Sequence, residues 1–355
     1  MSSAYLRIGR GRSPRTRLLL QLLLGLVFVA CLSAPAPVLA SEGDRAPEYQ
    51  LCTLDCEQRL CQQRVGNETI QVNPLPLYMR LLHWTCPDDC RYQCQHSVTA
   101  ARLERGEPVV QYHGKWPFTR ILGVQEPASV LFSLWNGYGH WRYLPVLAGS
   151  VNKRYFMRTV LLGYAFVGLN TWLWSAVFHV RDTPLTEKLD YFSAGFGILY
   201  GLYMAVCRVL YIRNMRTRRV LMAIFGALFT AHILYLTLDT RFDYAYNIAA
   251  CATVGMLHNL IWCAWAARNW RTRPYAWQVV ALVVCVTSAM MLELFDFPPL
   301  GWLVDAHALW HAATALLVPW WYRFLLADYA WETSEKNASG SRDALLVNRT
   351  QKLKD

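Results

Sequence analysis

The stretch FMRTVLLGYAFVGLNTWLWSAVFHV, residues 156–180, decides the fold. Its one charged residue is Arg158, close to the start, and a helix over this stretch is long enough to cross the roughly 30 Å apolar core of a bilayer. Six more apolar stretches of similar character cover approximately residues 126–147, 189–211, 219–238, 244–267, 275–294 and 303–326. We therefore predict an all-α polytopic membrane protein, with a bundle of seven transmembrane helices in residues 126–330.

The composition fits a membrane protein and argues against a nucleic-acid-binding protein. Of the 355 residues, 54% are hydrophobic and 15 are Trp, and the mean hydropathy is +0.17. The formal net charge is +11, but the basic residues form short clusters between the apolar stretches. Because a nucleic-acid-binding surface needs one concentrated basic patch, we expect no nucleic-acid partner.

The basic clusters also predict the orientation of the chain. They follow the first, third and fifth apolar stretches, whereas the loops after the second, fourth and sixth are neutral or acidic. The cluster residues are Lys153, Arg154, Arg158, Arg213, Arg216, Arg218, Arg219, Arg268, Arg271 and Arg273. Since basic loops stay in the cytosol, the N-terminal domain is predicted to be luminal and the tail, residues 331–355, cytosolic. The tail is polar from about Glu332, and we expect it to be disordered.

Residues 1–40 have the pattern of a signal peptide. Several arginines precede an apolar run from Leu18 to Ala30, and Val38-Leu39-Ala40 is a small-residue cleavage pattern. The mature chain is predicted to begin near Ser41, in an oxidising lumen. The alternative is a retained signal anchor, although the apolar run is short and prolines follow it.

Residues 41–125 form a predicted cysteine-rich luminal domain. Its six cysteines lie in two sets, Cys52, Cys56 and Cys61, then Cys86, Cys90 and Cys94. Behind a signal peptide an even number favours three disulfides over zinc, with fifteen possible pairings. The spacings fit helical turns, which favours pairing between the two sets over pairing within them. Asn67 is a predicted glycosylation acceptor if this domain is luminal.

Three histidines and an aspartate stand at one predicted membrane depth, near the lumen. His179 ends the second stretch, Asp190 begins the third, and His307 and His311 begin the seventh. Ser175 precedes His179 by four residues, as His307 precedes His311, so each pair shares one helix face. Two His on one helical turn and a third from another helix form a plausible Zn²⁺ set with an open fourth position.

The predicted chemistry is hydrolysis of an ester or amide at the membrane surface. A three-histidine Zn²⁺ lowers the pKa of its water and polarises a carbonyl. Asp190 would then act on that water, and Ser175 would donate a hydrogen bond to an oxygen at the centre. A Ser175–His179–Asp190 triad is the alternative, but it leaves His307 and His311 without a role.

Other polar residues have simpler interpretations. Isolated histidines such as His232 and His258 are expected to form hydrogen bonds between helices, and the same alternative applies to the histidine cluster itself. Asp296 and Asp305 are expected to be interfacial or to cap a helix. Glu293 has the same expectation and is also a candidate outer partner of a ligand.

The pattern S-x3-H, an Asp eleven residues after that His, and H-x3-H in the seventh stretch resembles the CREST superfamily of seven-helix membrane hydrolases. That superfamily includes alkaline ceramidases and the adiponectin and progestin receptor family. The resemblance implies that His179, His307 and His311 bind zinc. It also implies that Asp190 and Ser175 flank the water on the metal.

A narrower resemblance covers nearly the whole mature chain. The chain is similar to the post-GPI attachment to proteins factor 3 family in the segments SEGDRAPEYQLCTLDCEQRLC, LHWTCPDDCRYQCQ, YHGKWPF, EPASVLFSLWN, WSAVFHVRDTPLTEKLDYFSA and DFPPLGWLVDAHALWH. The resemblance implies removal of the sn-2 acyl chain from the glycosylphosphatidylinositol (GPI) of anchored proteins. It also implies residence in the Golgi membrane, with cycling through the endoplasmic reticulum.

Three function classes stay open on the sequence. The first is an acyl-ester hydrolase acting on GPI-anchored proteins, the second a ceramidase-like amidase, and the third a non-catalytic receptor or lipid-handling chaperone. The cysteine-rich domain either recognises the glycan or protein part of a substrate or caps the helices. The sequence patterns specify no oligomeric state.

Overall fold

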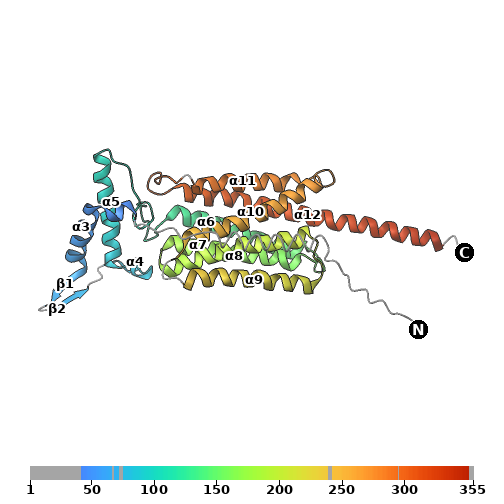
Figure 1. The fold of residues 1–355 in the computed structure, drawn as a ribbon, viewed down its shortest axis with the longest axis horizontal. Coiled ribbons are helices and arrows are strands. Elements are labelled where there is room, and N and C mark those ends of the chain that lie inside the picture. Colours follow the sequence, from blue (N-terminus) through green and yellow to red (C-terminus); the bar gives the residue numbers. More distant parts are fainter. Residues whose placement is uncertain (1–40, 66–67, 72–74, 239–241, 295, 352–355) are drawn as a thin grey trace, which may run out of the picture. The chain divides into compact units, whose positions relative to one another are not determined.

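The computed structural model describes residues 41–65, 68–71, 75–238, 242–294 and 296–351 (Figure 1). The predicted signal peptide and the acceptor Asn67 lie outside the described residues. The chain divides into two compact units. One unit includes Ile198–Trp262, and the other includes Val38–Gly197 and Cys263–Asp355.

Each of the seven apolar stretches is helical. The helices are α6 (Pro127–Ser150), α7 (Arg158–Val180), α8 (Pro184–Val209), α9 (Met215–Leu238), α10 (Tyr244–Asn269), α11 (Trp277–Leu294) and α12 (Ala306–Gln351). Four of them, α7 to α10, are long and apolar enough to cross a membrane, and α11 contains a shorter apolar segment. The predicted all-α membrane fold is confirmed, whereas seven crossings and their orientation remain predictions.

Helix α12, the long red helix of Figure 1, continues through the predicted start of the tail at residue 331 and ends at Gln351. The expectation of a disordered tail is therefore wrong for the backbone up to Gln351. A polar segment that follows a formed helix adds one hydrogen bond per residue and needs no new nucleus. No proline interrupts the chain after Pro319, so the sequence does not stop the helix.

The cysteine-rich domain, residues 41–125, is mostly helical. Its elements are α2 (Glu42–Arg45), α3 (Pro47–Cys56), the π-helix η1 (Glu57–Cys61), β1 (Gln62–Val65), β2 (Glu68–Gln71), α4 (Leu77–Leu81) and α5 (Cys86–Glu104). β1 and β2 pair as an antiparallel hairpin, a small departure from the predicted all-α fold. Thr85 and Asp88 form a capping box at the start of α5, which explains why this helix begins at Cys86.

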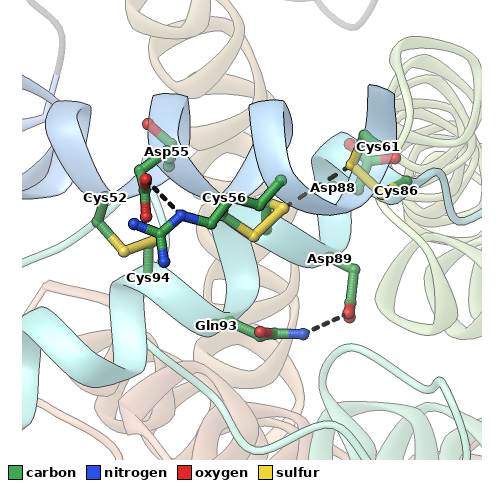
Figure 2. The surroundings of a disulfide bond; sticks show 12 residues. Cys52, Asp55, Cys56, Cys61, Cys86, Asp88, Asp89, Gln93 and Cys94 are labelled. Carbon is green, nitrogen blue, oxygen red and sulfur yellow. Dashed lines mark hydrogen bonds and ion pairs between the residues drawn. A yellow bond between two sulfur atoms is a disulfide. The ribbon is translucent and has the colours of Figure 1, made fainter. Parts of the chain in front are cut away.

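Three disulfides join α3 and η1 to α5, as Figure 2 shows. The pairs are Cys52–Cys94, Cys56–Cys90 and Cys61–Cys86, so every bond links the two sequence sets, as predicted. The regular four-residue spacing on α5 follows one helix face, but Cys61 follows Cys56 by five residues. The π-helix η1 supplies the wider turn that returns Cys61 to the face of Cys56.

We expect the double variant Cys56→Ala, Cys90→Ala to loosen this domain. Loss of a native disulfide from a small secreted domain costs about 2–5 kcal/mol, because the unfolded chain regains freedom. Limited proteolysis of the full chain should therefore cut within residues 41–125 faster. The control variant Cys251→Ala, Cys285→Ala removes two thiols that form no disulfide. Equal cleavage rates in both variants would contradict the expectation.

In the larger unit, α6 packs against both α7 and α12. His140 of α6 lies against Gly168 of α7, and its Nδ1 is 2.8 Å from the hydroxyl oxygen of Tyr322 in α12. A Cβ on Gly168 would stand 2.2 Å from two atoms of the His140 ring. A residue without a side chain is therefore required where α7 passes α6.

In the smaller unit, aromatic side chains join the helices that it contains. Tyr203 of α8 packs against Phe225 of α9, with ring centroids 5.8 Å apart. His232 of α9 lies 3.4 Å from the hydroxyl of Tyr246 in α10, measured from Nδ1. His232 thus has the interhelical contact expected of an isolated membrane histidine.

Gly168→Ala is expected to destabilise the helix packing by about 1–3 kcal/mol, the usual cost of overfilling a packed site. The His140 ring is held by Tyr322 and cannot move away without losing that contact. Gly149→Ala in α6 is the matched control, because a Cβ there meets nothing within 4 Å. Thermal unfolding in detergent should show a lower midpoint for Gly168→Ala alone. An equal midpoint in both variants would show that the His140 ring can move away without loss of stability.

Candidate metal centre

Three histidines converge at one end of α7 and α12. His179 lies in the last turn of α7, and His307 and His311 lie in the first turns of α12. Asp305 directly precedes α12, and its Oδ1 accepts a hydrogen bond from the backbone N–H of Ala308 at 2.8 Å. This contact caps the helix and fixes where its first turn begins, as predicted for Asp305.

The Nε2 atoms of the three imidazoles face one another. His307 Nε2 lies 3.3 Å from His179 Nε2 and 2.9 Å from His311 Nε2. Two nitrogens that each bind a tetrahedral zinc at about 2.05 Å stand about 3.3 Å apart. His179 and His311 are buried, and His307 is partly buried. The three imidazole nitrogens therefore fit a zinc ion in the kind of ligand atom, in the distances between these atoms and in their burial.

Glu126 holds His179 from the other side of its ring. His179 Nδ1 lies 2.8 Å from Glu126 Oε2, and both side chains are buried. A carboxylate can only accept a hydrogen bond, so Nδ1 carries the proton and Nε2 keeps its lone pair. This tautomer presents Nε2 to the centre, as a metal ligand requires.

Ser133 of α6 holds His311 in a similar way. Its Oγ lies 2.9 Å from His311 Nδ1 and 3.0 Å from the Oγ of Ser175. Asn136, one turn further along α6, donates from Nδ2 to the backbone oxygen of His311 at 2.8 Å. All three α6 and α7 side chains, Ser133, Asn136 and Ser175, are buried. α6 therefore orients both the ring and the backbone of His311.

Asp190 stands near the centre from a third helix. It lies in the second turn of α8, is partly buried, and interacts electrostatically with His307 and Lys115. Its backbone oxygen accepts a hydrogen bond from Ser193 Oγ at 3.0 Å. Of the three histidines, the Asp190 carboxyl group thus interacts with His307, which is only partly buried.

One lysine balances the acidic groups around the centre. Lys115 forms ion pairs with Glu126 and with Asp182, the latter at 3.1 Å from Nζ to Oδ2. Burial acts to lower the pKa of Lys115, but the carboxylates of Glu126 and Asp182 outweigh it, so its pKa lies above the ordinary value. Lys115 therefore remains charged beside Glu126.

The structure brings the predicted site residues together around the three histidines, and it argues against the alternative of a catalytic triad. His179, His307 and His311 form the cluster, Asp190 is beside it, and Ser175 connects to it through Ser133. Within the described residues no hydrogen bond joins Ser175 to His179, whose Nδ1 is held by Glu126. Ser175, His179 and Asp190 therefore do not have the hydrogen bonds of a catalytic triad.

Glu126 and Ser133 were missed by sequence reasoning. The sequence predicts Glu293 as the candidate outer partner of a ligand, and its side chain lies outside the described residues. A usable signal was present, because α6 carries buried polar residues at helical spacing: Glu126, Ser129, Ser133, Asn136 and His140. Two of these residues, Asn136 and His140, also interrupt the apolar stretch 126–147. A polar stripe in a spanning helix indicates a face turned toward other helices.

The chain is similar to one family model and to several known proteins with related names. A model described as the Per1-like family matches residues 76–329. A Xenopus tropicalis protein named "GPI-specific phospholipase A2-like PGAP3" is 43% identical over 292 residues, 82% of this chain and 91% of the relative. The Homo sapiens protein of that name is 39% identical over 306 residues, 86% of this chain and 95% of the relative.

A relative from an insect has a related name. The Drosophila melanogaster protein named "Post-GPI attachment to proteins factor 3" is 38% identical over 315 residues, 87% of this chain and 94% of the relative. No solved structure matches the chain.

Proposed function

This chain belongs to the Per1-like family, and from that premise we propose that it is a membrane hydrolase that remodels the lipid of GPI-anchored proteins. The bond that we propose it cleaves is the sn-2 acyl ester of the GPI anchor. The names of the relatives support the substrate and the reaction class. The cluster of His179, His307 and His311 is the observation that carries the proposal.

The cofactor that fits this cluster is Zn²⁺, held by the three Nε2 atoms. When bound, zinc supplies a Lewis acid that polarises a carbonyl and makes water more acidic. The protein contributes the tautomers that leave these nitrogens available. Glu126 fixes the proton of His179 on Nδ1, and the Ser133 hydroxyl oxygen accepts a hydrogen bond from the Nδ1–H of His311 when that ring is a ligand.

Asp190 and Ser175 have different proposed roles in the reaction. Asp190 accepts a proton from the attacking water and passes it to the leaving alkoxide. Ser175 donates a hydrogen bond from its hydroxyl group to the oxygen that becomes negative in the transition state. The hydrogen-bond series from His311 through Ser133 to Ser175 leaves the Ser175 proton available for this purpose.

The predicted topology places this chemistry at the luminal ends of the helices. His179 lies in the last turn of α7 and His307 in the first turn of α12. The cluster is therefore at the ends of these helices, where we propose that it reaches an acyl ester of the luminal leaflet. We propose a Golgi membrane location with possible cycling through the endoplasmic reticulum, a luminal N-terminal domain and a cytosolic C-terminus. A GPI-anchored protein presents its ester from the same side.

The test uses the purified full chain in lipid nanodiscs with a GPI-anchored protein that carries an unsaturated sn-2 chain. Mass spectrometry should detect one free fatty acid and one lyso-anchor per turnover. Removal of metal by a chelator should stop release, and Zn²⁺ should restore it.

Two outcomes would replace the proposal. Release from ceramide but not from the anchored protein would indicate a lipid amidase, for which the same cluster suffices. No release from either substrate by zinc-loaded protein would favour a receptor or a lipid-handling protein.

A further inference from the structure

We propose that Glu126 and Lys115 are positioning residues of the centre, and that through them the cysteine-rich domain sets the metal affinity. The inference rests on the proposed function, because it assumes that His179 is a metal ligand. It gives this domain a role at the centre itself, distinct from substrate recognition.

Glu126 touches His179 through both its side chain and its backbone. Besides the 2.8 Å contact to Nδ1, the backbone N–H of Glu126 donates to the backbone oxygen of His179 at 3.0 Å. The neighbouring Gln125 N–H donates to the oxygen of Val180 at 3.0 Å. The start of α6 is thereby held in register with the end of α7. A carboxylate that bonds the distal nitrogen of a ligating imidazole orients the ring and raises its basicity.

Lys115 fixes Glu126 in turn. Its ammonium group pairs with Glu126 Oε1, and the other oxygen of that carboxylate meets His179. The same ammonium lies 4.1 Å from the ring centroid of Phe178, the residue before His179. The lysine is thus enclosed between α6 and α7, where it has carboxylate partners and an aromatic face.

Lys115 comes from a turn of the cysteine-rich domain that is itself anchored. Tyr112 and Lys115 exchange backbone hydrogen bonds of 2.8 and 2.9 Å, and the Tyr112 side chain is buried in the core of that domain. The neighbouring Trp116 donates from Nε1 to Asp296 at 2.7 Å. Movement of this domain would therefore move the ammonium group that holds Glu126.

A second contact fixes the chain just beyond His179. Arg181 donates to Asp88 Oδ2 of α5 at 2.9 Å and stacks over Trp84 at 3.8 Å from the ring centroid. Asp88 belongs to the capping box that begins α5, next to the Cys61–Cys86 disulfide. The domain therefore contacts residues on both sides of the Glu126–His179 pair.

The test measures zinc affinity by chelator competition in purified full-length protein. Glu126→Ala should weaken zinc binding by about 10- to 100-fold, the usual effect of losing such a partner. Glu126→Gln keeps an acceptor but loses the charge, so its affinity should fall between Ala and wild type. Lys115→Met should weaken binding less than Glu126→Ala, and Lys115→Arg should stay near wild type.

Two controls separate positioning from general stabilisation. Glu107→Gln removes a carboxylate of the same domain that pairs with Arg105 at the surface, and it should leave zinc affinity unchanged. With Co²⁺ in place of zinc, the visible absorption of Glu126→Gln should differ from wild type in position or intensity. A purely structural role would lower the unfolding temperature but leave affinity and spectrum as in wild type.

The outcomes distinguish this inference from the proposed function. Equal zinc affinity and equal Co²⁺ spectra in wild type, Glu126→Gln and Lys115→Met would overturn the positioning role while leaving the hydrolase in place. A folded wild type that binds no zinc would overturn both the positioning role and the metal centre, and the fatty-acid assay would then decide whether the chain is a hydrolase. If Glu126→Ala does not fold, the Gln and Met variants carry the comparison.

Discussion

Replacing His307 and His311 together by alanine is expected to remove both the bound zinc and the release of fatty acid. Two of the three converging Nε2 atoms disappear, and His179 alone cannot hold the ion. A zinc ion held by these residues would supply several kcal/mol of transition-state stabilisation, and each 1.4 kcal/mol is about tenfold in rate. The rate should therefore fall by at least about 10³-fold.

The measurement is elemental mass spectrometry of purified protein beside the fatty-acid assay. His83→Asn is the control, because His83 is exposed in the cysteine-rich domain and asparagine accepts its φ of 58°. One zinc per wild-type chain, retained in the control and lost in the double variant, is the expected result. A metal-free wild type that still releases fatty acid would instead favour the Ser175 hydroxyl as nucleophile.

Asp190→Asn is expected to reduce turnover by about 10²- to 10⁴-fold while the zinc content stays at one per chain. Asparagine has nearly the same shape but cannot accept the proton of the attacking water. The carboxyl group is not among the three converging ligands, so the metal should remain. The loss should appear in kcat with little change in KM, because binding of the lipid does not depend on proton transfer.

The control for this variant is Asp243→Asn. The Asp243 side chain accepts a hydrogen bond from the backbone N–H of Tyr246 at the start of α10, and asparagine caps helices equally well. A non-catalytic receptor or chaperone would not need Asp190 to exchange a proton. Full activity of Asp190→Asn would therefore refute the proposed base, and loss of zinc in this variant would place Asp190 among the ligands.

The helices and part of the centre could be predicted because their signals are local. The run 156–180 specifies α7 by length and hydropathy alone, and H-x3-H places His307 and His311 on one face of α12. His179 could be added because the topology puts it at the same depth. The helical tail could not be predicted from composition, since continuation of α12 depends on the helix already formed before it.

Glu126, Ser133 and Lys115 depend on packing across long separations. Glu126 is 53 residues from His179 in the sequence, and Ser133 is 178 residues from His311. A serine in a membrane helix is common, and a glutamate at a helix start is first interpreted as a cap. Only the packing of α6 between α7 and α12 brings these side chains to the two imidazoles.

Because of the π-helix η1, the three disulfides should tolerate a deletion between Cys56 and Cys61 better than an insertion. In a regular α-helix each residue advances about 100°, so a spacing of four returns to nearly the same face and a spacing of six points to the opposite side. Deletion of one residue between Cys56 and Cys61 would let an ordinary α-helix carry all three cysteines of this set. Insertion of one residue would turn Cys61 away from Cys86. Shortening of this segment is therefore compatible with the three crosslinks, and lengthening is not.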